Sequence, residues 1–327
     1  MSKLLTALYK SISFLLFSVV IVTASFSSAS SEDKQSGENK FDDLIHNMRP
    51  MEKWLAGFSL PVNISEPWPP LDEASLKVGR YIYQARCAVC HGVKGDGKGP
   101  RAGDMKIKPR DFTEAKYKFR STPAGALPTD ADLFKTISRG LHGTAMVPWL
   151  GLNNSQKWLT IYYIKTFSDY FEDGEKAEVI TPPEPVKSSD EYVKLGAKVY
   201  DKAKCHECHG KEGYGDGMKA DKLKDDWLRP IKPMNFRERI LKRGLEINEI
   251  YLTVATGLNG TPMASYASFL TEDEILAVSY FIRSLAPDME TRVTLLRQHI
   301  ERDTLAGLRI DHMQGIRFRG PLMFPLR

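Results

Sequence analysis

The sequence predicts an all-α protein with two similar helical domains in tandem, joined by a proline-containing linker. Three observations carry this prediction. The 327 residues exceed what one small domain needs, a set of short motifs occurs twice in the same order, and apolar residues recur at helical spacing. No stretch alternates apolar and polar residues over the length of a useful strand.

The internal repeat consists of four motifs that follow one another twice. They are a Gly-x-x-x-Tyr pair, a Gly-Asp-Gly loop, a Pro-x-x-Phe motif and a Gly-Thr-x-Met motif. The matched positions are Gly79 and Tyr83 with Gly196 and Tyr200, residues 95–97 with 215–217, Pro109 and Phe112 with Pro233 and Phe236, and Met146 with Met263. A shared order of motifs predicts two structurally equivalent units.

The expected organisation follows from this repeat and from the composition of the segments around it. We expect a signal peptide or N-terminal anchor at 1–30, an extended lead-in at 31–71, a first domain at 72–172, a linker at 173–189, a second domain at 190–287, and a C-terminal helix and arm at 288–327. The lead-in is polar and then rich in proline, which leaves room for one short helix around 41–48. Three prolines (Pro182, Pro183 and Pro185) predict a semi-rigid linker that keeps the two cores separate.

Helices are expected where apolar residues recur every three or four positions or where a capping motif precedes them. In the first domain this predicts helices at 71–86, 129–139 and 155–167. In the second domain Thr271-x-x-Glu274 is a capping box that opens a helix. Apolar residues in the tail predict an amphipathic helix at 289–308.

The N-terminus has the order of an export signal. Lys3 and Lys10 precede an apolar run at 12–26 and small residues at 27–30. The uncharged stretch 11–31 is also long enough to span a membrane, which leaves an uncleaved anchor as the alternative. Serines and a threonine lower its hydrophobicity and favour cleavage. Either way, most of the chain is expected outside the cytoplasm.

Composition excludes some classes of function. With 42% hydrophobic and 27% charged residues the chain is typical of a soluble globular protein. A net charge of +5 is too small to indicate nucleic-acid binding. Residues 94–120 are locally basic, which indicates either a solvated face or a docking rim for an acidic partner.

The four cysteines form two Cys-x-x-Cys-His motifs, Cys87 to His91 and Cys205 to His209, with Cys90 and Cys208 as the inner thiols. This motif is the signature of c-type haem attachment. Two thiols three positions apart lie on one face of a helical turn and can both reach the porphyrin, and the next histidine faces the iron. We therefore expect two covalently bound haem c groups with His91 and His209 as iron ligands. A thioredoxin-like pair lacks its strand-helix context here, and a zinc site would need closer pairs.

The expected sixth ligands are Met146 and Met263. Both follow a Gly-Thr dipeptide at equivalent positions of the repeat. A thioether is a soft ligand suited to haem iron, and His/Met ligation raises the reduction potential. His142 competes in the first unit, but Asn259 replaces it in the second, so we expect His142 at the haem edge or the surface. His206 should point away from the iron, exposed or bonded to a propionate.

These motifs resemble tandem-domain dihaem c-type cytochromes of bacteria, over residues 72–287. The segments 108–112 and 144–149 look like cytochrome subunits that accompany respiratory oxidoreductases. The resemblance implies a periplasmic protein that transfers single electrons between a redox protein donor and a redox protein acceptor. It implies no catalytic residues. It also implies that these partners are other subunits of a respiratory complex. Arg110 is a candidate propionate partner.

The alternative function is a dihaem cytochrome c peroxidase. Such an enzyme needs one haem with an open or releasable distal position and acid-base groups beside it. Both repeats carry the same candidate methionine, and no pair of a distal histidine and an acid stands out. The sequence therefore favours electron transfer.

Overall fold

The computed structural model describes residues 50–55, 59–173, 177–186, 189–237, 241–287 and 291. The chain divides into two units, Met1–Met48 and Arg49–Arg327, and every described residue belongs to the second. The expected export segment, the helix expected at 41–48 and the tail beyond 291 lie outside the described residues. No helix among the described residues has the length and apolar character to cross a membrane.

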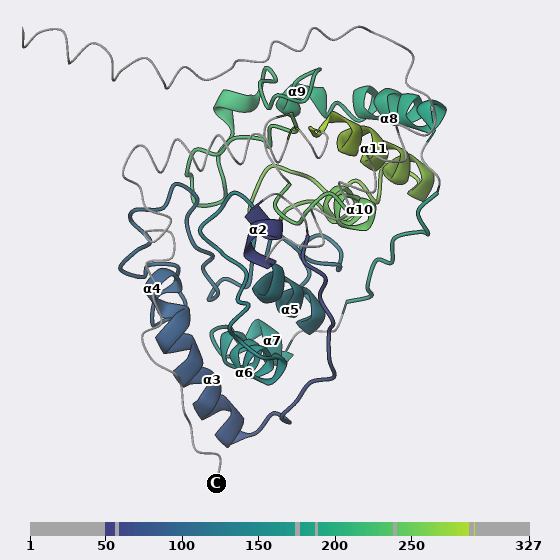
Figure 1. The fold of residues 1–327 in the computed structure, drawn as a ribbon. Coiled ribbons are helices and arrows are strands. Elements are labelled where there is room, and N and C mark those ends of the chain that lie inside the picture. Colours follow the sequence, from purple (N-terminus) through teal and green to yellow (C-terminus); the bar gives the residue numbers. More distant parts are fainter. Residues whose placement is uncertain are drawn as a thin grey trace, which may run out of the picture. The chain divides into compact units, whose positions relative to one another are not determined.

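The described residues are helical, which confirms the all-α prediction (Figure 1). The helices are α2 (Pro50–Leu55), α3 (Glu73–Arg86), α4 (Ala88–His91), α5 (Asp130–Arg139), α6 (Asn154–Lys165), α7 (Tyr170–Asp173), α8 (Asp190–Lys202), α9 (His206–His209), the 3₁₀ turn η1 (Ala220–Lys222), α10 (Ile247–Thr256) and α11 (Glu272–Leu285). The described segments contain no strand, only an isolated bridge between Lys224 and Pro230. Below, residues 72–172 are the first half and residues 190–287 the second half.

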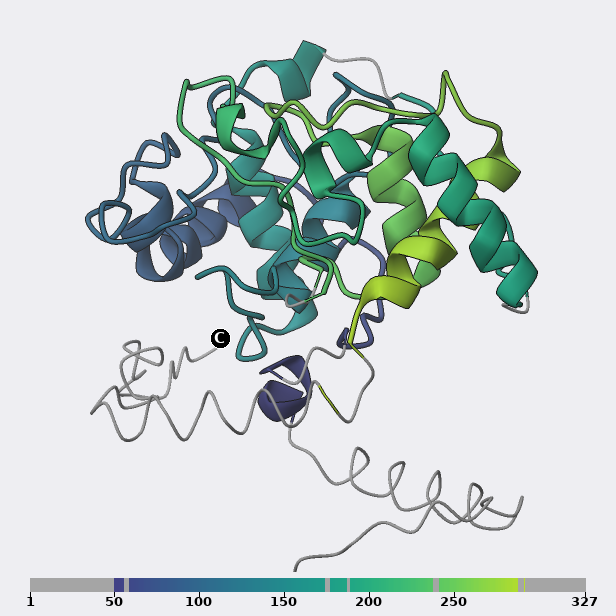
Figure 2. The same cartoon turned by 90° about the horizontal axis from the view of Figure 1, so that it is seen from above.

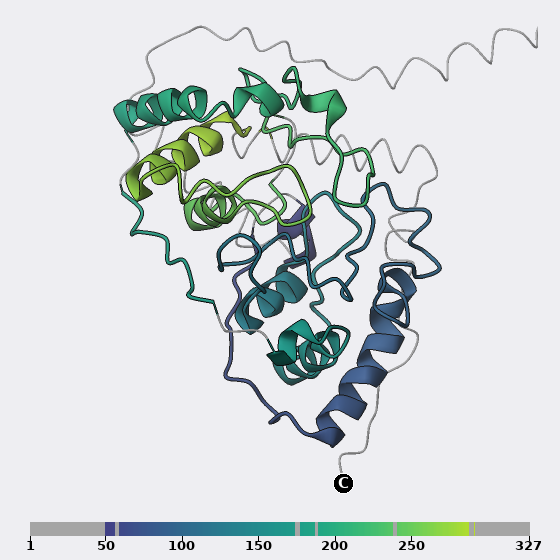
Figure 3. The ribbon, with the colours of Figure 1, turned by 180° about the vertical axis from the view of Figure 1, so that it is seen from behind.

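The same crossing of two helices organises both halves. In the first half α3 packs on α6 (Figure 3), and in the second α8 packs on α11 (Figure 2). Glycine permits the close approach at each crossing. A Cβ atom on Gly79 would lie 2.1 Å from the Leu159 carbonyl oxygen, and one on Gly196 would lie 2.1 Å from that of Ala277. The two glycines of the repeat therefore occupy equivalent packing positions.

Local capping signals fix where several helices begin. The Asp72 carboxylate accepts a hydrogen bond from the Ser75 amide (2.7 Å) at the start of α3. Capping boxes at Thr129 and Asn153 begin α5 and α6, and the one expected at Thr271 begins α11. Each half then buries its own apolar core, around Tyr83 in the first half and around Tyr200 in the second.

The lead-in packs on both halves. The Trp158 indole donates to Ser65 (3.2 Å), and the Arg139 Nε donates to the Leu60 carbonyl (3.0 Å). The lead-in also contacts the second half, where the Ser59 hydroxyl donates to the Glu246 carboxylate (2.6 Å). Residues 59–71 of the lead-in form no helix, and these contacts hold them against the protein.

Candidate haem-binding sites

Each Cys-x-x-Cys-His motif forms one helical turn, α4 in the first half and α9 in the second. The His91 Nδ1 lies 3.0 Å from the Arg110 carbonyl oxygen, and the His209 Nδ1 lies 3.1 Å from that of Met234. Because a carbonyl only accepts, Nδ1 carries the proton in both rings and Nε2 keeps its lone pair. Each ring is therefore oriented to offer Nε2 to a metal.

An aromatic ring stacks on each of the two histidines with nearly the same geometry. His91 stacks on Phe112 (centroids 4.5 Å apart, planes at 16°), and His209 stacks on Phe236 (4.6 Å, 14°). Burial lowers the pKa of both imidazoles, which favours the neutral form that binds iron. The Pro-x-x-Phe motif of the repeat thus provides two supports for each histidine, the carbonyl of its second residue and the phenyl ring of its fourth.

The turn after each histidine is held by backbone hydrogen bonds. The Tyr83 hydroxyl donates to the Gly92 carbonyl (2.7 Å), and the Gly97 amide donates to the His91 carbonyl (2.9 Å). In the second half Tyr200 donates to Gly210 (2.8 Å). There the amide that reaches the histidine carbonyl belongs to Gly215, at 2.8 Å.

The sequence match between the two Gly-Asp-Gly loops was therefore wrong by two positions. It paired Gly95 with Gly215, whereas the hydrogen bonds pair Gly97 with Gly215. Gly97 and Gly215 each follow their histidine by six positions, whereas Gly95 follows His91 by four, so the mismatch arises after the histidines. A separate difference lies before the cysteines, where the second half has one extra residue between Tyr200 and Cys205. Lys204 absorbs it by adopting a left-handed conformation with φ of 56°.

The two candidate methionines lie in loops with the same hydrogen bonds. The Met146 amide donates to the Thr144 hydroxyl (3.1 Å), and the Leu141 amide donates to the Met146 carbonyl (2.8 Å). The corresponding distances are 3.2 Å for Met263 to Thr261 and 3.0 Å for Leu258 to Met263. Both methionines are partly buried. The Gly-Thr-x-Met motif therefore encodes one loop shape, used twice.

Comparison with known proteins agrees with this duplicated geometry. The sequence matches the cytochrome c family over residues 76–168 and again over 193–286. This chain belongs to the cytochrome c family. A solved structure described as the Kuenenia stuttgartiensis reducing HAO-like protein complex Kustc0457/Kustc0458 contains a similar chain, 38% identical, with a TM-score of 0.64. The match covers 69% of this chain and all of that one. No curated protein matches the sequence.

The protein is thus a dihaem c-type cytochrome, and its residues fit the group. Each half supplies two thiols on one turn, an imidazole with a free Nε2 and, at the equivalent position of the repeat, a methionine loop. Burial raises the pKa of the Cys87 thiol to about 12 and that of Cys205 to about 11, so without a bound group both are neutral thiols at neutral pH. Among the described residues no three His, Cys, Asp or Glu side chains gather to hold a metal ion.

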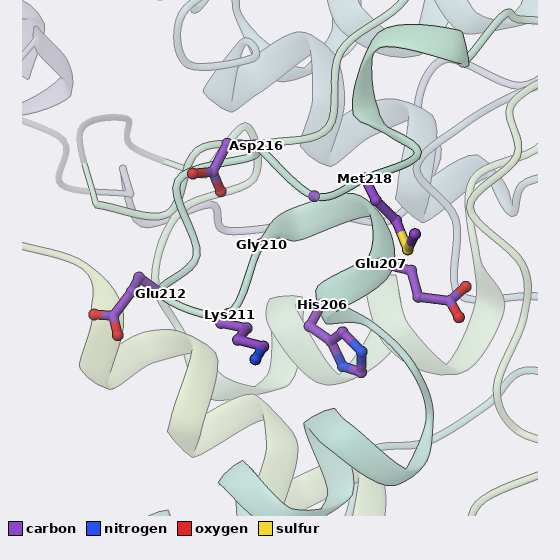
Figure 4. A pocket seen from close by; sticks show the side chains of 8 residues that line it. His206, Glu207, Gly210, Lys211, Glu212, Asp216 and Met218 are labelled. Carbon is purple, nitrogen blue, oxygen red and sulfur yellow. The ribbon is translucent and has the colours of Figure 1, made fainter.

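The other histidines of the cytochrome occupy different surroundings. His142 is buried, at 5% exposure, and stacks on Trp54 of α2 at 5.0 Å. Of the two positions expected for His142, burial rules out the surface, and the haem edge stays a prediction. His206 is partly exposed, with Nδ1 3.3 Å from Asp201, and lines an open pocket beside α9 with Glu207, Lys211 and Met218 (Figure 4). His46, His299 and His312 lie outside the described residues.

The basic segment 94–120 divides into two groups. Lys94, Lys98 and Lys106 are exposed. The other group faces the second half, where Lys116 pairs with Asp226 (2.9 Å) and the buried Arg120 donates to the Thr256 carbonyl (2.7 Å). The sequence did not predict this second use, because the acceptors lie more than a hundred residues further along the chain.

Proposed function

We propose that this dihaem cytochrome passes single electrons in the periplasm and that an HAO-like oxidoreductase is one of its redox partners. The observation that carries the proposal is the similarity to a chain solved within an HAO-like complex, which extends over the whole of that chain. Members of this family are typically exported, which supports a periplasmic location. The expected export segment at 1–30 agrees with it.

We assign each iron one histidine and one methionine, His91 with Met146 and His209 with Met263. The thioether links would come from Cys87 and Cys90 in the first half, and from Cys205 and Cys208 in the second. Carbonyl acceptors at Nδ1 fix the plane of each imidazole and raise its basicity. Bound haems would supply a one-electron iron couple, and an iron held by both a histidine and a methionine would have no ligand position left for a substrate. This supports an electron carrier rather than an enzyme.

Spectroscopy of the haem-loaded protein tests the ligand assignment. We expect two low-spin ferric haems and a sulfur-to-iron band at the red end of the visible spectrum. Met146→Ala and Met263→Ala should each remove the contribution of one haem to this band, whereas Ala substitution of the exposed Met218 (80% exposed) should remove none. A high-spin haem in the unsubstituted protein, together with peroxide turnover, would instead favour the peroxidase.

Reconstitution with the HAO-like oxidoreductase of the same organism tests the partner. The two proteins should co-elute at low salt, and stopped-flow mixing should show electron exchange at a rate that saturates with partner concentration. A monohaem cytochrome c from an unrelated organism serves as a non-cognate control. If exchange with the oxidoreductase is no faster than with this control and no complex elutes, the proposed partner is wrong, while the ligand assignment stands on its own spectra.

A further inference from the structure

The second half contains an insertion that the first half lacks. Six more residues separate Ala220 from Pro233 than separate the equivalent Ala102 from Pro109. The extra residues form a small hairpin, residues 223–231. It is closed by the Lys224–Pro230 bridge and by a hydrogen bond from the Ile231 amide to the Leu223 carbonyl (3.0 Å).

The tip of this hairpin contacts the first half through Trp227. Its indole Nε1 donates to the Glu114 carboxylate at 2.7 Å. The Arg110 guanidinium lies over the ring, 4.9 Å from its centroid, and the Lys116 ammonium lies at 5.6 Å. Cations over an indole face are attracted by the ring quadrupole. Trp227 therefore has both a polar anchor and a stacking partner in the other half.

The same tryptophan ring also meets the methionine loop of its own half. Gly260 belongs to that loop, residues 257–263, and an added Cβ there would lie 3.0 Å from the Trp227 ring. The Asp226 amide also donates to the Gly260 carbonyl (3.2 Å). The hairpin tip is thus in contact with the loop that carries Met263.

We propose that Trp227 is a positioning residue, which uses its anchor on Glu114 and Arg110 of the first half to hold the Met263 loop of the second. The inference rests on the assignment of Met263 as an iron ligand. Its consequence is that residues of the first half control the axial sulfur of the second haem. Arg110 also supplies the carbonyl that orients His91, so one residue contacts the supports of both haem sites.

The test is a substitution in the first half with its readout in the second. In the reduced, haem-loaded protein, the methyl groups of ligand methionines are displaced in the NMR spectrum by the haem ring current. Met146→Ala identifies which signal belongs to which haem. We expect Glu114→Ala and Trp227→Leu to shift or broaden the Met263 signal and to change the midpoint potential of the second haem, with the Met146 signal unchanged.

Matched controls separate this effect from general loosening. Asp130→Asn removes a first-half carboxylate of similar exposure that pairs with Lys165 within that half, and it should shift neither signal. Trp227→Phe keeps a ring and removes the donor, so it should give a smaller shift than Trp227→Leu. If Trp227→Leu does not fold, Trp227→Phe and Glu114→Ala together test the proposal.

Two results would overturn the proposal: an unchanged Met263 signal in both Glu114→Ala and Trp227→Leu, or equal shifts of both methionine signals. If the unsubstituted protein shows no ring-shifted signal for Met263, the assignment of Met263 as a ligand is wrong. The spectrum of the unsubstituted protein therefore distinguishes failure of the ligand assignment from failure of the role proposed for Trp227.

Discussion

At the scale of the residue, His142 shows how burial gives a side chain a measurable effect on stability. Burial lowers its pKa to about 4, and the nearby Arg139 adds to the effect. The unfolded chain has the ordinary histidine value near 6.5, so between these values the unfolded state binds more protons than the folded state. The free energy of unfolding should therefore not depend on His142 protonation above about pH 6.5, and it should fall as the pH drops toward 4.

This gives the first prediction. His142→Asn should flatten the decline in the free energy of unfolding between pH 6.5 and 4, a decline of roughly 3 kcal/mol for a shift of this size. Asparagine is chosen because Asn259 occupies the equivalent position in the second half. Urea titrations at several pH values measure the effect. His206→Asn, at the partly exposed pocket, is the control. The prediction is contradicted if the free energy of unfolding of His142→Asn declines with falling pH as steeply as that of the unsubstituted protein.

At the scale of the element, α10 depends on a residue from the other half. Its last carbonyls, of Thr256 and Gly257, accept hydrogen bonds from the fully buried Arg120 guanidinium at 2.7 and 3.4 Å. A cation at a helix C-terminus satisfies unpaired carbonyls and interacts favourably with the helix dipole. α10 leads directly into the Met263 loop, so this cap stabilises the element that carries the candidate ligand.

The second prediction concerns this cap. Arg120→Met keeps much of the side-chain volume but leaves the Thr256 carbonyl without its side-chain donor, which should lower the free energy of unfolding by about 2 kcal/mol. The Gly257 carbonyl keeps the Thr256 hydroxyl as a donor (3.1 Å). Amide hydrogen exchange should accelerate in the last turn of α10 and not in α5. Arg101→Met removes an exposed ion pair with Asp104 and should change stability little. Equal effects of the two substitutions would argue against a cap across the halves.

The same scale shows what the sequence could predict. The helices expected at 129–139 and after Thr271 were confirmed because their capping boxes are local signals. α10 was not predicted: it is buried on nearly every side, so its apolar residues show no helical stripe. The contacts of Arg120 and Trp227 could not be predicted either, because repeat matching aligns the halves and says nothing about how one packs on the other. The haem-attachment motifs, by contrast, are local and were identified directly from the sequence. The assignment of the methionines rests on the repeat and stays a prediction.

At the scale of the whole molecule, the halves have separate apolar cores and share a charged contact. Glu249 of the second half is buried, with 7% of its side chain exposed, and pairs with Arg139 of the first half at 3.0 Å and with Arg243 at 2.5 Å. Removing the anion from a buried cluster leaves its cations uncompensated, which typically costs about 3–5 kcal/mol. Because the buried apolar residues that the structure describes form two separate clusters, cooperative unfolding of the halves should depend on this charged cluster.

The third prediction is that Glu249→Gln uncouples the two halves. Calorimetry of the haem-loaded protein should show one unfolding transition for the unsubstituted chain and two for the variant, because each core can then melt alone. The lower transition should belong to the second half, which loses the buried anion, and loss of absorbance from the second haem should accompany it. Glu73→Gln, in an exposed pair with Lys77, should leave a single transition. A single transition in Glu249→Gln, merely shifted, would mean that the remaining contacts between the halves, such as those of Arg120 and Trp227, are sufficient for cooperative unfolding.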